Sequence, residues 1–460
     1  MLLLFPLIYI AAFIYGVFLL AKSKVEGLLI FIVFALPIYI NTMSVSFMAG
    51  FSKAIPFLQF FKELLVIMSA IIIAFSIHKY KKIQLHFIDK LMIFFFLYTL
   101  AYLIIPVGSY SVFFKLLAFK NISFFPLLYF IGRFVDFKFL PLLKIYSFIL
   151  VVIIVAFVVA LFEKITYTHL HSITGYADYN LKFFDTEPNG KYGLSWTFET
   201  ESGLKRFGSI FSNPLEFAAA IILALAIALA MVTYKQEMLV VKFESLQGLA
   251  IIATFLSILF AASRASFVSY FLVIYIYAWV TKMKRALFYF HIAAVITVIV
   301  FIYFVEGSLY EYVVNTITFT NTSSLGHIIE WLDGIDAMTN SPLGLGLGES
   351  GRVANSSGDN IGGENQLIII GVQAGVIAMF TYLSIYISLM VIAIKNLKRE
   401  AGAFYTLALI TLLIKVGLII PMFTANIDSY IYVSYLSWFL AGLLINFNQT
   451  PKEATIALCV

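Results

Sequence analysis

The chain is a succession of long apolar stretches separated by short polar connections. Most of these stretches reach about 20 residues, the length that an α-helix needs to cross the hydrocarbon core of a bilayer. We therefore predict an all-α polytopic membrane protein with about twelve or thirteen spanning helices. The thirteen predicted spans lie at roughly 2–22, 26–44, 54–77, 90–107, 113–133, 141–163, 214–234, 247–262, 265–281, 286–305, 366–394, 402–420 and 429–447.

The two spans on either side of Arg264 are predicted from one interrupted apolar run. That run is roughly 34 residues long, which is too long for a single crossing. Ser263 and Arg264 interrupt it. Two short helices joined by a tight turn explain the run better than one long helix does.

Basic residues are concentrated in alternate connections, and this sets the expected orientation. The remaining connections carry few Lys or Arg. By the positive-inside rule, the N-terminus lies outside, the C-terminus lies inside, and the long connections 164–213 and 306–364 both face outward. The basic connections contain Lys22 and Lys24; Lys79, Lys81 and Lys82; Arg133 and Lys138; Lys235 and Lys242; Lys282, Lys284 and Arg285; and Lys395, Lys398 and Arg399.

The two long connections divide the chain without creating separate domains. No linker and no internal repeat stands out, so we expect one helical unit with two external loops. In order, the predicted parts are N-terminal spans (1–163), a first external loop (164–213), central spans with an outer Ser-Arg turn (214–305), a second external loop (306–364) and C-terminal spans (365–460).

The composition agrees with this architecture. Hydrophobic residues make up 62% of the chain and charged residues 12%, whereas soluble domains carry about 25% charged residues. The first apolar run has no basic region before it and ends at Lys22 and Lys24, so we expect a span and not a cleavable signal peptide. A single cysteine, Cys459, excludes an internal disulfide and a multi-cysteine metal cluster. The net charge of +6 is ordinary for basic cytoplasmic loops, and no nucleic-acid partner is expected.

Several basic residues fall on the outer side, against the usual bias. A basic side chain at mid-membrane depth costs roughly 2.5–3.5 kcal/mol on insertion scales, so these residues are candidates for an anion-binding site. For Lys115 and Lys415, snorkelling to outer headgroups is an equal alternative; for Lys120, next to Asn121, a polar cavity is favoured. The set comprises Arg206, Arg264, Lys115, Lys120 and Lys415.

The second external loop holds the most distinctive polar stretch of the chain. A short amphipathic helix is predicted first, because Ile328, Trp331, Leu332 and Ile335 share one helical stripe. Pro342 and a run of alternating glycines then break it. Gly362-Gly363-Glu364-Asn365 leads directly into an apolar helix, which places Glu364 at a helix start, a favourable position for a carboxylate. Close to apolar surface, its pKa is expected to be raised.

The first external loop ends in a second junction of this kind. Asn213-Pro214 predicts a turn followed by a helix start, so the polar residues between Arg206 and Glu216 are aimed at the membrane surface. The pair His169 and His171 has a spacing seen in metal sites. No further histidines or cysteines accompany it nearby, so neither a metal nor another cofactor is predicted.

Three motifs, taken in order, resemble the O-antigen ligase and polymerase superfamily of bacterial membrane glycosyltransferases. The resemblance covers about the C-terminal 60% of the chain. The motifs are R-F-G-S-I-F-S-N-P-L at 206–215, S-R-A-S at 263–266, and H-x3-W-x10-P-L-G-L-G-L-G from His327, followed by E-N-Q-L at 364–367 with Gly371 and Gly375. Related ligases carry His-Asn where this chain has Glu364-Asn365, which looks more like the polymerase branch. Family members often have Arg where this chain has His327.

The resemblance implies a GT-C-like architecture and a multi-pass location in the bacterial cytoplasmic membrane, with the active site facing the periplasm or outside. It also implies a metal-independent, inverting transfer between glycans carried on polyprenyl pyrophosphate, with a flippase and a chain-length regulator as further partners. Arginine suits bidentate contact with the pyrophosphate, and the acceptor hydroxyl needs a general base. The expected base is Glu364, with His327 second; the expected substrate-binding residues are Arg206, Arg264, Lys120, Asn365, Asn213 and Lys415.

Two other functions stay open at this point. One is a ligase that moves finished glycan onto lipid A core or another acceptor. The other is a non-enzymatic transporter or flippase of lipid-linked glycans. Transporters often contain inverted repeats and helices broken at mid-membrane. Here no repeat is detected and the polar residues gather on one side, which favours a polysaccharide polymerase of the O-antigen or capsule type.

Overall fold

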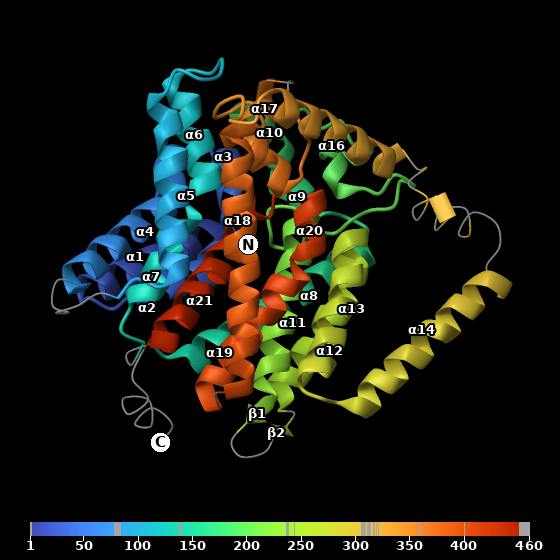
Figure 1. Cartoon of the computed structure of the whole chain (residues 1–460). Coiled ribbons are helices and arrows are strands. Elements are labelled where there is room, and N and C mark those ends of the chain that lie inside the picture. The colour runs from blue at the N-terminus through green and yellow to red at the C-terminus, as the bar shows by residue number, and fades with distance from the viewer. Residues whose placement is uncertain are drawn as a thin grey trace.

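The computed structural model (Figure 1) describes most of the chain. The described residues are 2–77, 84–137, 140–235, 239–242, 244–304, 310, 314–315, 318, 320, 322–357, 360–399 and 401–449. Of the residues named from the sequence, the following lie outside these ranges: Lys79, Lys81, Lys82, Lys138 and Cys459.

The described part of the chain is mostly helical. One small hairpin, β1 (Thr233–Lys235) paired antiparallel with β2 (Leu239–Val241), is its only sheet. The helices are α1 (Leu4–Ala21), α2 (Glu26–Ala35), α3 (Tyr39–Met48), η1 (Ser52–Ala54), α4 (Ile55–Ile77), α5 (Phe87–Ile104), α6 (Val112–Ser123), α7 (Phe125–Phe134), α8 (Leu142–Thr166), α9 (Leu170–Ile173), α10 (Tyr176–Phe184), η3 (Trp196–Phe198), α11 (Pro214–Met231), α12 (Ser245–Ala261), α13 (Arg264–Val280), α14 (Lys284–Phe304), α16 (Thr322–Asn340), α17 (Arg352–Ser357), α18 (Gln366–Arg399), α19 (Gly402–Gly417), α20 (Ile419–Thr424), η4 (Ile427–Ser429) and α21 (Ile431–Gln449).

Each of the thirteen predicted spans coincides with an apolar helix or a bent pair of helices. Within the described residues, nine helical segments are long and apolar enough to cross a membrane, and two bent pairs qualify when each is taken as one span. The remaining two predicted spans, 247–262 and 265–281, are the 17-residue helices α12 and α13. Ala262, with a positive φ of 47°, turns the chain between them, so the predicted tight turn is confirmed. By length and composition, these helices are those of a multi-pass membrane protein.

Two predicted spans are broken, which the apolar pattern did not indicate. The helices α2 and α3 meet at a bend of 63°, and α6 and α7 at a bend of 45°. Pro37 lies in the first break, and Pro126 is the second residue of α7. A proline lacks the backbone N–H and its ring clashes with the preceding turn, so a continuous helix is disfavoured at both positions.

The second external loop folds back against a break inside α18. Gly375 has φ 80° and ψ 170°, a conformation that interrupts the helix and suits only glycine. The backbone groups released there are paired by the loop: Leu345 N donates to Val372 O at 2.7 Å, and Val376 N donates to Pro342 O at 3.0 Å. Non-helical backbone is tolerated among apolar helices only with such partners. The glycine-rich segment is therefore part of the packed structure.

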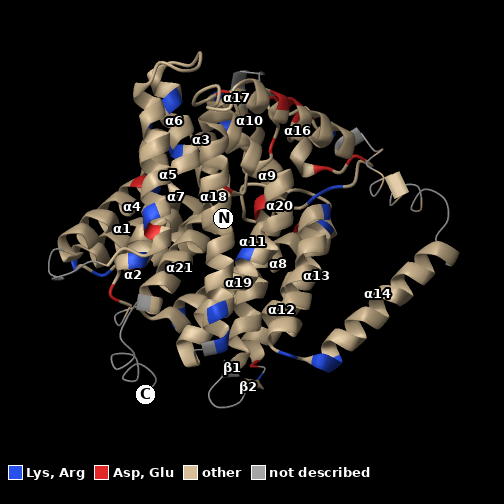
Figure 2. Ribbon diagram, viewed as in Figure 1, with Lys and Arg blue, Asp and Glu red and all other residues tan. Residues whose placement is uncertain are grey.

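Burial separates a central group of helices from peripheral ones. In the apolar windows of α11 and α21, 89% and 83% of the residues are buried, whereas none is buried in that of α14. Alanines fill much of α11, and small side chains let neighbouring helices approach closely. In Figure 1, α14 stands apart from the bundle. Figure 2 shows that Lys, Arg, Asp and Glu lie mostly near the ends of the helices and in the loops.

The predicted helix of the second loop exists as α16, but only part of its apolar stripe is buried. Leu332 and Ile335 are 59% and 47% exposed. Of the stripe, Trp331 lies on the inward face, together with Gly334 and Met338. At Gly334 the helix lies so close to Gly362 and Ile368 that a Cβ atom would collide with them. This close approach decides which face of α16 turns inward, and that face differs from the one that the apolar residues alone would select.

Candidate functional site

Glu364 lies between the glycine pair that precedes it and the start of α18, beside α16. Gly362 and Gly363, both with positive φ, lead into it, and Asn365 follows it. A Cβ atom on Gly363 would collide with the Glu330 carboxylate on α16, so glycine is required for this approach. On the same helix, His327 Nδ1 lies 3.5 Å from Glu330 Oε2. The two predicted catalytic residues, Glu364 and His327, are thus neighbours across the α16–α18 contact.

The surroundings of Glu364 favour its protonated form. Its side chain is accessible, but loss of hydration within the surrounding protein raises its pKa above the usual value. Glu330 adds to the increase in the pKa, while His327 and Arg206 oppose it. A raised pKa is what the sequence analysis expects of a carboxylate at this position. It brings the group closer to the range in which a general base works at neutral pH.

The end of the first external loop lies against the turn between α12 and α13. Arg206 N donates to Phe198 O at 2.8 Å, and Phe207 N donates to Phe260 O at 3.1 Å. Phe260 is next to the last residue of α12, and Arg264 begins α13. The two predicted arginines therefore lie at the same end of the bundle, and Arg206 is close enough to Glu364 to act on it electrostatically.

The two predicted substrate-binding asparagines are helix caps. Asn213 Oδ1 accepts hydrogen bonds from Leu215 N and Glu216 N, both at 2.9 Å. Asn365 Oδ1 accepts from the backbone N–H groups of two residues of α18, Leu367 and Ile368. A cap satisfies backbone donors that the helix leaves unpaired. Their amide oxygens therefore position α11 and α18, and with them the acidic residues beside each cap.

Tyr430 is a member of the site that the sequence analysis missed. It lies in the connection between η4 and α21, where loss of hydration raises its pKa well above the usual range. Glu364, Glu216 and Arg206 all act on it electrostatically. The buried Glu216 is held in turn by Ser212 Oγ and by the backbone N–H of Tyr432. The starts of α11, α18 and α21 thus converge on one polar region.

Arg352, on α17, is the second missed member. Its guanidinium stacks over the Phe184 ring, 4.9 Å from the centroid, and it is close enough to interact electrostatically with Glu216 and Tyr176. No periodic pattern marks this segment. One signal was available, because Arg352 is the only Lys or Arg in 306–364.

Lys120 and Lys115 are not brought to the arginines by any contact within the described residues. Lys120 Nζ lies 2.8 Å from Glu63 Oε1, so the predicted polar surroundings are present, but on the side of α4. Lys115 Nζ donates to Val107 O at 2.7 Å, and its residue is only 7% exposed. Lys115 thus has a partner inside the protein, the carbonyl group of Val107.

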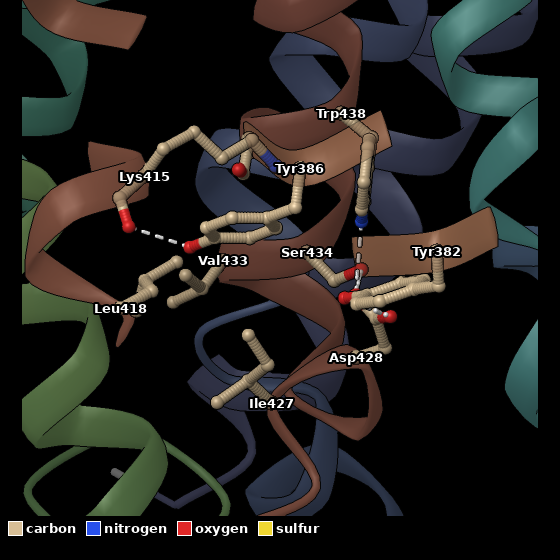
Figure 3. A pocket seen from close by; sticks show the side chains of 10 residues that line it. Tyr382, Tyr386, Lys415, Leu418, Ile427, Asp428, Val433, Ser434 and Trp438 are labelled. Atoms are coloured by element: carbon tan, nitrogen blue, oxygen red, sulfur yellow. Dashed lines mark hydrogen bonds between the residues drawn. The ribbon is translucent and has the colours of Figure 1, made fainter. Parts of the chain in front are cut away.

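Lys415 also lies inside the bundle, and the roles expected for it stay predictions. It is 1% exposed, and its Nζ lies 3.5 Å from the centroid of the Trp438 ring. Figure 3 shows it at a small cavity between α18, α19 and α21 that also contains Asp428. Asp428 accepts hydrogen bonds from Trp438 Nε1 and Tyr382 Oη. The cavity measures about 10 Å³, the volume that one water molecule requires.

The histidine pair serves the packing of the first loop. His169 and His171 are 1% and 0% exposed and lie against the Phe198 ring. His171 Nε2 lies 2.8 Å from Phe211 O, five residues beyond Arg206. In the described residues, no three His, Cys, Asp or Glu side chains are grouped in a way that could hold a metal ion.

We expect the first external loop to lose stability as the pH falls. Burial lowers the pKa of His169 to about 4 and that of His171 to about 3, whereas the unfolded value is about 6.5. Between these values the unfolded loop binds more protons, so stability is present above about pH 6.5 and is lost below it. The protection factors for hydrogen exchange in 167–213, which compare the measured rate with the intrinsic rate at the same pH, should therefore be lower at pH 5 than at pH 7.5. His169→Phe keeps the ring packing and should weaken this pH dependence; equal protection factors at the two pH values in the wild type would contradict the assignment.

Neither a comparison with models of known protein families nor a search of the curated proteins finds a match for this chain.

Proposed function

We propose that this chain is a membrane glycosyltransferase that polymerises lipid-linked oligosaccharides at the outer face of the cytoplasmic membrane. The proposal rests on one observation above all. An accessible carboxylate with a raised pKa, Glu364, lies within electrostatic range of Arg206 and His327 at one end of a bundle of apolar helices. Such a site offers a base and a cation to a substrate that reaches it from the membrane.

The chemistry that fits this arrangement is a single displacement. The acceptor hydroxyl oxygen forms a bond to the anomeric carbon of the donor glycan while the bond from that carbon to the pyrophosphate oxygen breaks. The hydroxyl proton passes to Glu364, and the polyprenyl pyrophosphate leaves with the bonding electrons. Arginines fixed near the leaving group stabilise the charge that develops on it. Attack opposite the leaving group inverts the anomeric configuration.

The bent spans favour a second candidate function, transport of lipid-linked glycans. The breaks between α2 and α3 and between α6 and α7 lie beside charged residues on apolar helices. Broken helices with intramembrane charges are typical of transporters. The polymerase is preferred because the carboxylate, the arginines and both external loops gather at one end, where chemistry on an external substrate takes place.

Reconstitution of the full chain in lipid vesicles distinguishes the two functions. With a polyprenyl-pyrophosphate-linked repeat unit supplied on the side of the external loops, a polymerase produces a ladder of longer glycans and releases polyprenyl pyrophosphate. A transporter moves the repeat unit across the bilayer and leaves its length unchanged. A protein that elongates no glycan under these conditions contradicts the proposed function.

A further inference from the structure

A second group of charged residues lies among the helices on the other side of the candidate site. Lys62 and Glu63 on α4 and Lys120 on α6 carry two positive charges and one negative charge. All three lie about two turns inside helices that are apolar enough to be spans. Ionisable residues in such segments are costly, and they are usually functional.

The three residues are held in a fixed arrangement. Lys62 Nζ lies 3.2 Å from Glu63 Oε1 and donates to Tyr39 Oη and to Gln59 O at 3.1 and 2.8 Å. These contacts use the three donors of its ammonium group. Lys62 is 6% exposed. It therefore positions Glu63, and it has no donor left for a ligand.

Glu63 and Lys120 retain groups that a ligand can use. Glu63 is 8% exposed, and its Oε2 atom is buried without a hydrogen-bond partner among the described residues. Leaving such an oxygen unpaired costs free energy. The Lys120 side chain is 40% exposed, and Glu63 Oε1 occupies one of its three donors. The pair thus offers an acceptor beside an accessible cation.

The cluster of Lys62, Glu63 and Lys120 is linked to the candidate site through contacts that do not involve Arg206 or Arg264. Gln59 Nε2 donates to the Tyr179 hydroxyl on α10, in the first external loop, at 2.8 Å. Arg352, which acts on Glu216, is also close enough to act on Lys62 and Tyr179. Side chains on a helix lean toward its N-terminus, which is the outer end of α4 and α6 in the proposed orientation. The charged groups therefore point toward the face at which the site opens.

We propose that Lys120 and Glu63 bind the phosphate end of the second, acceptor lipid, while the arginines bind the donor. This inference rests on the proposed function, because a polymerase of lipid-linked units holds two polyprenyl-linked substrates at once. A phosphate oxygen accepts from the free donors of Lys120. A hydroxyl of the adjoining sugar donates to Glu63 Oε2. A glycosyl phosphate is the class of ligand that supplies both groups within one short unit.

The first test measures binding, independently of activity. Native mass spectrometry of the full chain with polyprenyl phosphate should show two bound lipids in the wild type. Lys120→Gln should retain one, and the double variant Arg206→Gln/Arg264→Gln should retain the other. Lys53→Gln, an exposed cation at the outer end of the same region, should keep both. Two lipids bound to a folded Lys120→Gln variant overturn the proposal, as does equal displacement of polyprenyl phosphate by phosphatidylglycerol, which would show an ordinary lipid site.

The second test separates the two substrates kinetically. In the vesicle assay, Lys120→Gln should raise the KM for the lipid-linked acceptor about tenfold or more, the size expected for one charge-assisted hydrogen bond, while the KM for the donor stays unchanged. Lys120→Arg should recover most of the loss. An equal increase in both KM values contradicts the assignment. If the wild type elongates no glycan, the proposed function fails, and the binding stoichiometry still decides whether this second lipid site exists.

Discussion

Glu364→Gln is expected to abolish long polymer while single lipid-linked repeat units accumulate. Glutamine keeps the size of the side chain but removes the proton acceptor, and loss of a general base typically lowers a rate by about 10²–10⁴. Glu364→Asp should keep partial activity, because the base survives one methylene further back. The measurement is the glycan ladder on gels, with membrane protein levels compared by immunoblot.

The pH profile gives this prediction an independent readout. The base works in its ionised form, and the pKa of Glu364 is raised above its usual value by loss of hydration. The wild-type rate should therefore fall as the pH drops through that raised pKa. The residual rate of Glu364→Gln should not show this decrease. Asp333→Asn, on the exposed surface of α16, is the matched control and should leave the ladder intact. Full-length polymer from Glu364→Gln, with none from His327→Ala, would transfer the role of base to His327.

Arg264→Lys and Arg206→Lys are expected to lower polymer synthesis strongly, although both proteins insert normally. Lysine keeps the charge but loses the planar fork that contacts two phosphate oxygens at once. The corresponding alanine variants should lose about 10²–10³ in rate, the usual cost of removing a group that stabilises developing charge. The measurement is the rate of polyprenyl pyrophosphate release in vesicles.

Arg285→Lys is the matched control for this second prediction. Arg264 is the first residue of α13, whereas Arg285 lies at the start of α14, just after the last residue of α13. In the proposed orientation, Arg285 therefore faces the cytoplasm. The same substitution there should leave the release rate unchanged. Wild-type release from Arg264→Ala would show that Arg264 serves the packing of the α12–α13 turn and not the leaving group.

The positions of the spans were predictable because each depends on local composition alone. About 20 consecutive apolar residues predict a crossing whatever the positions of the neighbouring helices. All thirteen predicted spans coincide with helices or bent pairs of helices. The bends were not predicted, although Pro37 and Pro126 are visible in the sequence. Proline is tolerated in membrane helices when neighbouring groups satisfy the released backbone, so a proline alone does not decide between a kink and a break.

The candidate site was predictable only where a motif marks a helix start. Glu364 and Arg206 were found because they flank glycine or Asn-Pro junctions next to apolar helices. Tyr430 and Arg352 were missed, because their membership depends on the approach of α11, α17, α18 and α21, which are distant in the sequence. Lys120 and Lys415 were identified as unusual cations, but the sequence did not reveal their partners. Lys120 pairs with Glu63, and Lys415 lies on Trp438.

The sequence by itself determined a multi-pass helical protein, its span positions and the turn at Arg264, because hydrophobic length and local turn chemistry are properties of contiguous residues. Only the tertiary structure decided which charges face one another. Close packing at Gly334 and Gly363 sets the rotation of α16, and thereby brings His327 and Glu330 to Glu364. The position of α4 against α6 joins Glu63 to Lys120. Such pairings depend on how helices pack across tens of residues of separation, and local hydrophobicity does not specify that packing.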